Sequence, residues 1–99
     1  MTETASQLTL EPQRAAAADL AAKSDVANAK TAVIAYQTND PLAFPTVTEL
    51  GPWGYTASEG VPTVTLTGGA TDFCVSTTSE TGSAFHATMT SSVEEGACP

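Results

Sequence analysis

Positive charge is scarce in this 99-residue chain. Three Lys or Arg side chains stand against eleven Asp or Glu, which gives a formal net charge of −8. Proteins that bind nucleic acids or anionic membrane surfaces need a surplus of basic side chains. We therefore expect neither to be a direct partner. The bases, Arg14, Lys23 and Lys30, all fall in the first third of the sequence.

Long apolar runs are missing as well. No window approaches the about 18 apolar residues that a membrane-spanning helix needs. Residues 1–13 are polar and acidic, without the basic and apolar regions of a signal peptide. If the protein works outside the cytoplasm, we expect its targeting segment to lie outside this sequence.

Side chains that carry catalysis are few. His86 is the only histidine, and it falls on the predicted solvent face of a strand with no free thiol expected nearby. Asp72, Glu94 and Glu95 could meet at one end of a sheet and offer oxygens to calcium, but they lack the regular spacing of a calcium loop, and solvated carboxylates are the simpler interpretation. We therefore expect no enzymatic activity, no metal and no cofactor.

Only two cysteines are present, Cys74 and Cys98, 24 positions apart. A bridge between them would stabilise the fold by about 3.5 kcal/mol in the chain-entropy model and would indicate an oxidising compartment. The alternative is two unrelated buried thiols. We favour the disulfide, because Cys98 is the penultimate residue and an untethered terminus would fray.

Residues 15–38 form the most distinctive stretch. They contain no Gly and no Pro, and ten of them are Ala, the best helix former. Pro12 suits the first turn of a helix, and Asn39 followed by Asp40 and Pro41 suits its end, with Asn39 able to adopt a left-handed cap. The sequence predicts a helix over about 13–38.

Two apolar lines follow this helix. The first has the spacing of a buried face, which begins at Ala15 and Ala18 and is predicted to reach the core at Ala22, Val26, Ala29, Val33 and Tyr36. The second lies almost opposite, at Leu20, Ala27 and Ile34, seven positions apart. We expect the second line to contact a neighbouring subunit. The alternative is that these are ordinary exposed apolar residues.

The segment 39–60 is predicted to be an irregular connection. Its larger apolar residues, Leu42, Phe44, Val47 and Leu50, are expected to fold back on the helix. Trp53 is expected to fill a gap in the core, and the alternative is a ligand platform formed with Tyr55.

Alternating patterns predict three strands over 61–67, 72–78 and 83–90, joined by turns at Gly68-Gly69 and at 79–82. One face of this sheet should cover the helix, and it carries Val64, Leu66, Phe73, Val75, Phe85 and Met89. The other face is rich in Thr and Ser. The fold class is therefore α+β, a long N-terminal helix packed on a three- to four-stranded antiparallel meander. The sheet spans about 61–90, and a tail, 91–99, closes a disulfide-bounded region.

The order of these pieces resembles the type IV pilins and pseudopilins, in particular pilin-like proteins of actinobacteria. The resemblance rests on PQRAAAADLAAKSDVANAKTAVIAYQTNDPLAFPT (12–46), on DFCVS (72–76) and on the GAC ending (96–98). It implies a non-catalytic structural subunit of an extracellular, cell-surface filament that serves adhesion, motility or DNA uptake. Its partners would be other copies of the chain and the pilus assembly machinery.

The chain departs from that family at its beginning. Family members start with a short basic leader and about 20 apolar residues that anchor the precursor in the membrane and later form the filament core. Residues 1–11 match neither, so we expect a non-family or added tail followed by a pilin-like soluble domain at 12–99. Two alternatives stay open: a pseudopilin of a competence or type II-like secretion apparatus, and a secreted ligand-binding module.

Overall fold

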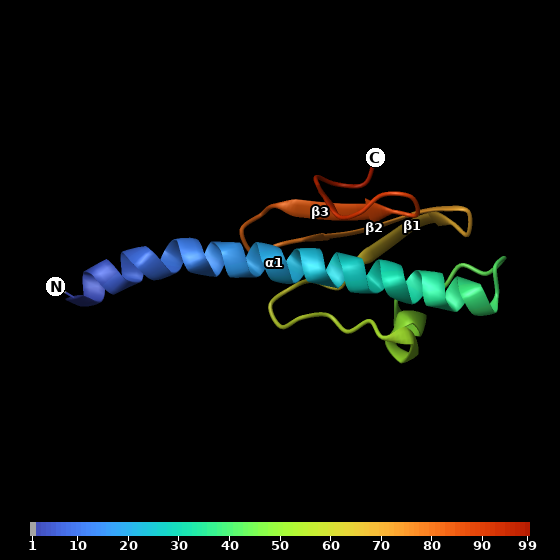
Figure 1. The fold of residues 1–99 in the computed structure, drawn as a ribbon, viewed down its shortest axis with the longest axis horizontal. Coiled ribbons are helices and arrows are strands. Elements are labelled where there is room, and N and C mark those ends of the chain that lie inside the picture. The colour runs from blue at the N-terminus through green and yellow to red at the C-terminus, as the bar shows by residue number, and fades with distance from the viewer. Residues whose placement is uncertain (1) are drawn as a thin grey trace.

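The structure is a computed structural model that describes residues 2–99, with side chains described for 14–99. Helix α1 (Thr2–Asn39) lies along an antiparallel sheet and projects beyond it at its N-terminal end (Figure 1). A 3₁₀ helix, η1 (Thr48–Trp53), covers another side of α1 near its C-terminal end. The molecule measures 60 × 27 × 16 Å. The predicted α+β class is confirmed.

The sheet is a four-stranded meander in the order β1-β2-β3-β4. Its strands are β1 (Thr65–Gly69), β2 (Asp72–Thr78), β3 (Ala84–Thr88) and the short β4 (Glu94–Glu95). Every neighbouring pair is antiparallel. The predicted meander is therefore present, and its fourth strand comes from the predicted tail, 91–99.

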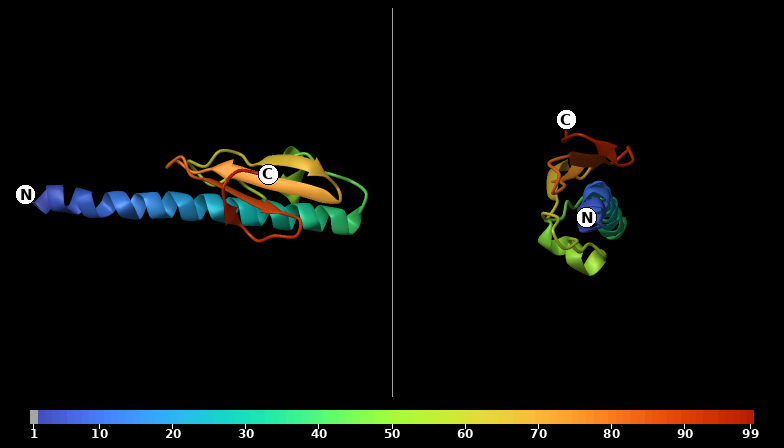
Figure 2. Two further views of the ribbon diagram at one scale, coloured as in Figure 1. Left: turned by 90° about the horizontal axis from the view of Figure 1, so that it is seen from above. Right: turned by 90° about the vertical axis from the view of Figure 1, so that its left-hand side faces the viewer.

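The core lies between the inner face of the sheet and one face of α1. Ala22, Val26, Ala29 and Val33 of the predicted helix face are fully buried, whereas Tyr36 is half-buried. The sheet and connecting loops contribute the rest of the core, chiefly Leu50, Val64, Phe73, Val75, Phe85 and Ala87. The end-on view in Figure 2 shows the sheet and the η1 loop around α1 and one flank of the helix left uncovered.

The bounds of the helix differ from the prediction at its start. It begins at Thr2, before the predicted start near residue 13, and Pro12 lies inside the helix. A proline inside a helix removes one backbone hydrogen bond, and the flanking residues, free of Gly, continue the helix on both sides. The helix ends at Asn39 as predicted, but among the described residues only glycines have a positive φ, so Asn39 makes no left-handed cap.

Two further differences concern the loops. The predicted Gly68-Gly69 turn lies inside β1, and the hairpin turns at Ala70 and Thr71 instead. Gly68 has a φ of 90°, and a Cβ there would lie 2.0 Å from the carbonyl oxygen of Asp72. This position therefore tolerates no side chain, and glycine allows the strand pairing to continue through it. The segment 39–60 also contains the unpredicted η1.

Three large apolar side chains expected in the core are exposed. Trp53 is 39% exposed, Met89 is 41% exposed and Leu42 is 88% exposed. Trp53 lies edge-on to Tyr36, with ring centroids 5.9 Å apart, at the margin of the core. Met89 follows the last residue of β3 and so leaves the covered part of the sheet. Leu42 lies in the turn after α1, before the chain folds back.

Candidate functional site

The uncovered flank of α1 carries the second apolar line. Leu20 is 67% exposed and Ile34 is 44% exposed, and Ala27 between them is exposed too. All three of these residues are thus exposed on the surface of the described chain. Their role as a subunit contact stays a prediction.

Three hydroxyl-bearing residues, which were not predicted from the sequence, extend this line. Together the six exposed positions are spaced four and three residues apart in alternation, and we call them the helix seam: Leu20, Ser24, Ala27, Thr31, Ile34 and Thr38. This is the spacing of a surface that packs on another helix. The hydroxyl-bearing members, at 24, 31 and 38, are seven residues apart, and this repeat could have indicated them from the sequence.

The hydroxyls of the helix seam are mostly satisfied within the helix. Thr31 Oγ1 donates to the carbonyl of Ala27 at 3.0 Å, and Thr38 Oγ1 donates to that of Ile34 at 2.8 Å. Because these donors already have partners, a neighbour that covered them would not bury an unpaired donor. The seam also carries no charged residue, so covering it removes no ion from water.

The lysines beside the seam are turned toward the rest of the molecule. Lys30 Nζ donates to the carbonyl of Ser91 at 2.5 Å. Lys23 Nζ lies 5.2 Å from the centre of the Phe85 ring, within range of a cation–π contact. Both lysine side chains therefore link α1 to β3 or to the segment that follows it.

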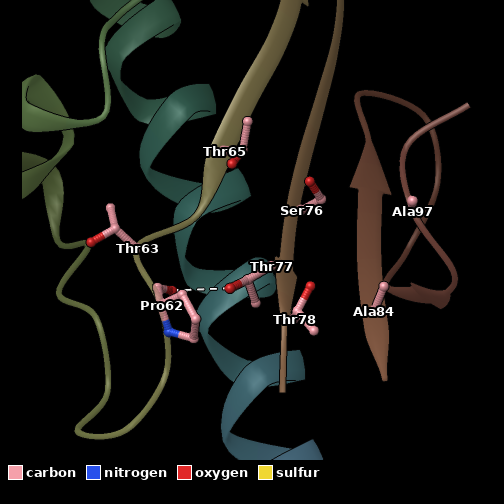
Figure 3. A pocket seen from close by; sticks show the side chains of 8 residues that line it. All are labelled: Pro62, Thr63, Thr65, Ser76, Thr77, Thr78, Ala84 and Ala97. Carbon is pink, nitrogen blue, oxygen red and sulfur yellow. Dashed lines mark hydrogen bonds between the residues drawn. The ribbon is translucent and has the colours of Figure 1, made fainter. Parts of the chain in front are cut away.

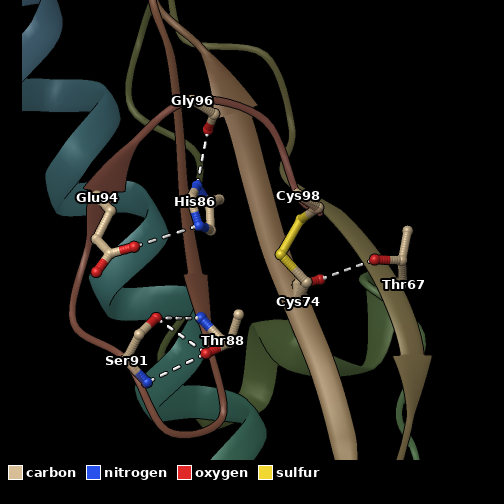
Figure 4. The surroundings of a disulfide bond; sticks show 8 residues. All are labelled: Thr67, Cys74, His86, Thr88, Ser91, Glu94, Gly96 and Cys98. Atoms are coloured by element: carbon tan, nitrogen blue, oxygen red, sulfur yellow. Dashed lines mark hydrogen bonds and ion pairs between the residues drawn. A yellow bond between two sulfur atoms is a disulfide. The ribbon is translucent and has the colours of Figure 1, made fainter.

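His86 lies on the outer face of the sheet, but the prediction that its side chain is exposed to solvent is wrong. The chain after β4 passes over this face, and only 9% of His86 is exposed (Figure 4). Its Nδ1 lies 2.9 Å from the carbonyl oxygen of Gly96, and its Nε2 lies 3.6 Å from Glu94 Oε2. A carbonyl oxygen only accepts hydrogen bonds, so Nδ1 is the donor. His86 thus helps to hold the C-terminal segment in place.

The two cysteines are joined, as predicted. The Cys74–Cys98 disulfide links β2 to the C-terminal segment, with Cα atoms 6.0 Å apart. Both thiols are therefore consumed, and neither is available as a nucleophile.

The three carboxylates considered for calcium do not meet. Glu94 of β4 pairs with His86 of β3, and His86 pairs with Ser76 of β2. Asp72 is the first residue of β2 and pairs with Gly69 of β1, away from Ser76. Within the described part of the chain, no group of three His, Cys, Asp or Glu residues could hold a metal ion.

A shallow hollow lies on the outer face of the sheet (Figure 3). Hydroxyl-bearing residues line one side, among them Thr65, Ser76 and Thr78, and Ala84 and Ala97 line the other. Thr77 Oγ1 donates to the Pro62 carbonyl at 3.0 Å. No ionisable side chain lines this hollow, so it offers neither a general acid nor a general base.

An aromatic platform made of Trp53 and Tyr55 is not present. Tyr55 is buried, and its hydroxyl accepts a hydrogen bond from the Val64 amide at 3.0 Å. It therefore cannot form an exposed surface with Trp53.

Comparison of the chain with protein-family models, with curated proteins and with solved structures finds no match. In residues 2–99, no helix has both the length and the apolar content to cross a membrane.

Proposed function

We propose that this chain is a structural subunit of an extracellular filament of the type IV pilus kind, and that the helix seam is where neighbouring subunits touch it. The single observation that carries the proposal is the exposed, uncharged seam on a helix that projects beyond its own sheet. One face of α1 packs in the core of its own chain, and the helix seam has the spacing of a surface that packs on another helix. Such a helix can contact its own sheet and a neighbouring subunit at the same time.

The distribution of charge supports contacts through the helix. Residues 40–99 contain no Lys or Arg and seven carboxylates, namely Asp40, Glu49, Glu59, Asp72, Glu80, Glu94 and Glu95. Two such surfaces repel each other. Neighbouring subunits therefore meet more favourably along α1, where the seam is neutral, than through the acidic parts of their sheets and loops.

The Cys74–Cys98 disulfide supports an extracellular location, because such bonds persist mainly in oxidising compartments. In this role the chain is mechanical rather than catalytic, and its partners are other copies and the assembly machinery.

The test is an assembly assay in source cells that express the full-length gene. Ile34→Asp places a charge on the seam and should abolish or strongly reduce fibres counted by electron microscopy. Asn28→Asp adds the same side chain to an exposed helix position outside the seam, and it should leave fibres unchanged. Circular dichroism of the purified domain provides the folding control. Normal fibres with Ile34→Asp, or unfolding of that domain, would contradict the assigned contact.

A further inference from the structure

The two edges of the sheet differ in how they are protected. The edge strand β4 consists of two exposed glutamates, Glu94 and Glu95. Charged side chains on an edge strand discourage pairing with another strand. The opposite edge strand, β1, is longer, is bonded to β2 alone and carries no charge. Of the two edges, the β1 edge is therefore the one that remains open to a further strand.

The β1 edge also lies in a neutral segment of the sheet-forming region. Residues 60–71 contain no Asp, Glu, Lys or Arg, although the whole chain has a net charge of −8. Two copies of so acidic a chain repel each other over most of their surfaces. Edge-to-edge contact at β1 brings two neutral strands together and keeps the carboxylates of β4 on the far sides.

The sequence of β1 is complementary to itself. Thr65, Leu66 and Thr67 read the same in both directions. In an antiparallel pair centred on Leu66, Thr65 of each copy faces Thr67 of the other, and the two Leu66 residues face each other. Threonine–threonine and aliphatic cross-strand pairs are favourable. Leu66 is half-buried and packs on the core, so the paired Leu66 would extend that apolar layer.

We infer that β1 pairs with β1 of a second copy of this chain about a two-fold axis, which joins two sheets into one. The pairing begins at residue 65, since the Val64 amide already donates to the Tyr55 hydroxyl. A two-fold contact closes on itself and yields a pair rather than a filament. The inference therefore does not rest on the proposed function.

The experiment is sedimentation velocity of the purified chain over a range of concentrations, at about 0.15 M and 0.5 M salt. One strand pair buries less than a standard interface, so we expect a weak dimer with a Kd on the order of 100 μM. Higher salt should strengthen it, because screening weakens the repulsion between acidic copies.

Three variants separate this contact from others. Thr65→Glu places a charged side chain on the β1 edge, as the glutamates do on β4. It should raise the Kd of the dimer by at least about tenfold. Thr78→Glu adds the same charge to an exposed threonine of β2, away from the open edge, and should leave the dimer intact. A mixture of Thr65→Glu with Thr67→Lys should restore pairing, because the introduced carboxylate of one copy then faces the introduced ammonium group of the other.

A chain that stays monomeric at millimolar concentration, or a dimer that Thr65→Glu leaves unchanged, would overturn the inference. A dimer that Ile34→Asp abolishes and Thr65→Glu does not would also overturn it, and would instead place self-association on the helix seam. If the β1 dimer forms while fibres are absent from source cells, the proposed function fails and this inference stands.

Discussion

The carboxylate of Asp25, buried on the inner face of α1, accepts two hydrogen bonds from Ser58. The Ser58 amide donates to Oδ2 at 2.8 Å, and the Ser58 hydroxyl donates to Oδ1 at 2.6 Å. A buried charge is tolerated only where such donors replace water. This pair therefore fixes the loop after Tyr55 to the middle of the helix.

Ser58→Ala should destabilise the fold by about 1.5–3 kcal/mol, because it leaves one oxygen of a buried carboxylate without its donor. Urea denaturation of the purified domain measures the change. Ser24→Ala, at an exposed helix position, is the matched control and should alter stability by less than about 0.5 kcal/mol. Equal effects of the two variants would show that the Asp25–Ser58 contact is not maintained.

Gly68→Ala should destabilise the fold by more than about 2 kcal/mol, since its Cβ would collide with the Asp72 carbonyl and its φ is positive. The control is the neighbouring Gly69→Ala, where an added Cβ meets no atom within 4 Å. Thermal melts of both variants provide the comparison. A Gly68→Ala protein as stable as Gly69→Ala would mean that the β1–β2 hairpin has another register.

Reduction of the Cys74–Cys98 disulfide should lower the free energy of unfolding by about 3.5 kcal/mol, because it releases the constraint on the unfolded chain. Denaturation with and without reductant measures this loss, and intact mass should rise by two hydrogens. The β3–β4 pairing and the contact of His86 with Gly96 should keep the C-terminal segment docked in the reduced protein. Hydrogen exchange at the Gly96 amide, which donates to Ala84, reports on that docking.

Acid should weaken the fold in part through Glu49. The Thr46 amide, together with the Thr46 hydroxyl, holds the pKa of Glu49 below its ordinary value. A carboxyl group whose pKa is lowered by folding stabilises the protein above its unfolded pKa, about 4.3. That contribution is lost as the pH falls below this value toward the lowered pKa.

The Glu49→Gln variant should therefore lose less stability than the parent between about pH 5 and pH 3. Melting temperatures measured across that range provide the test. Asp19 supplies an internal comparison, because hydrogen bonds from Ser79 and Thr81 lower its pKa as well and remain in the variant. An identical pH profile for parent and variant would contradict the Thr46–Glu49 contact.

The sequence predicted the elements whose side-chain period is regular. The inner helix face and the alternation of β2 follow directly from burial of every third or fourth residue, or of every second one. It failed where a contact joins distant segments. His86 was predicted to face solvent, but the C-terminal segment covers it, and the burial of Asp25 against Ser58 was not predicted.

Glycine gave a second kind of error. Gly68-Gly69 has the composition of a hairpin turn, but strand pairing extends through both residues, and the turn follows at Ala70 and Thr71. The six positions of the helix seam were half predicted, because the apolar members stand out in the sequence. Its hydroxyl-bearing members stand out less in the sequence, and the bonds of Thr31 and Thr38 to the helix carbonyls are found only in the structure.

Immunogold electron microscopy of unpermeabilised source cells, with antibody against this chain, tests whether the chain is a filament subunit. We expect gold in rows along thin extracellular fibres. Gold confined to the cell envelope, without fibres, would contradict the long filament and favour a short pseudopilus of a secretion or competence apparatus. Label found only in the medium would contradict the filament hypothesis altogether.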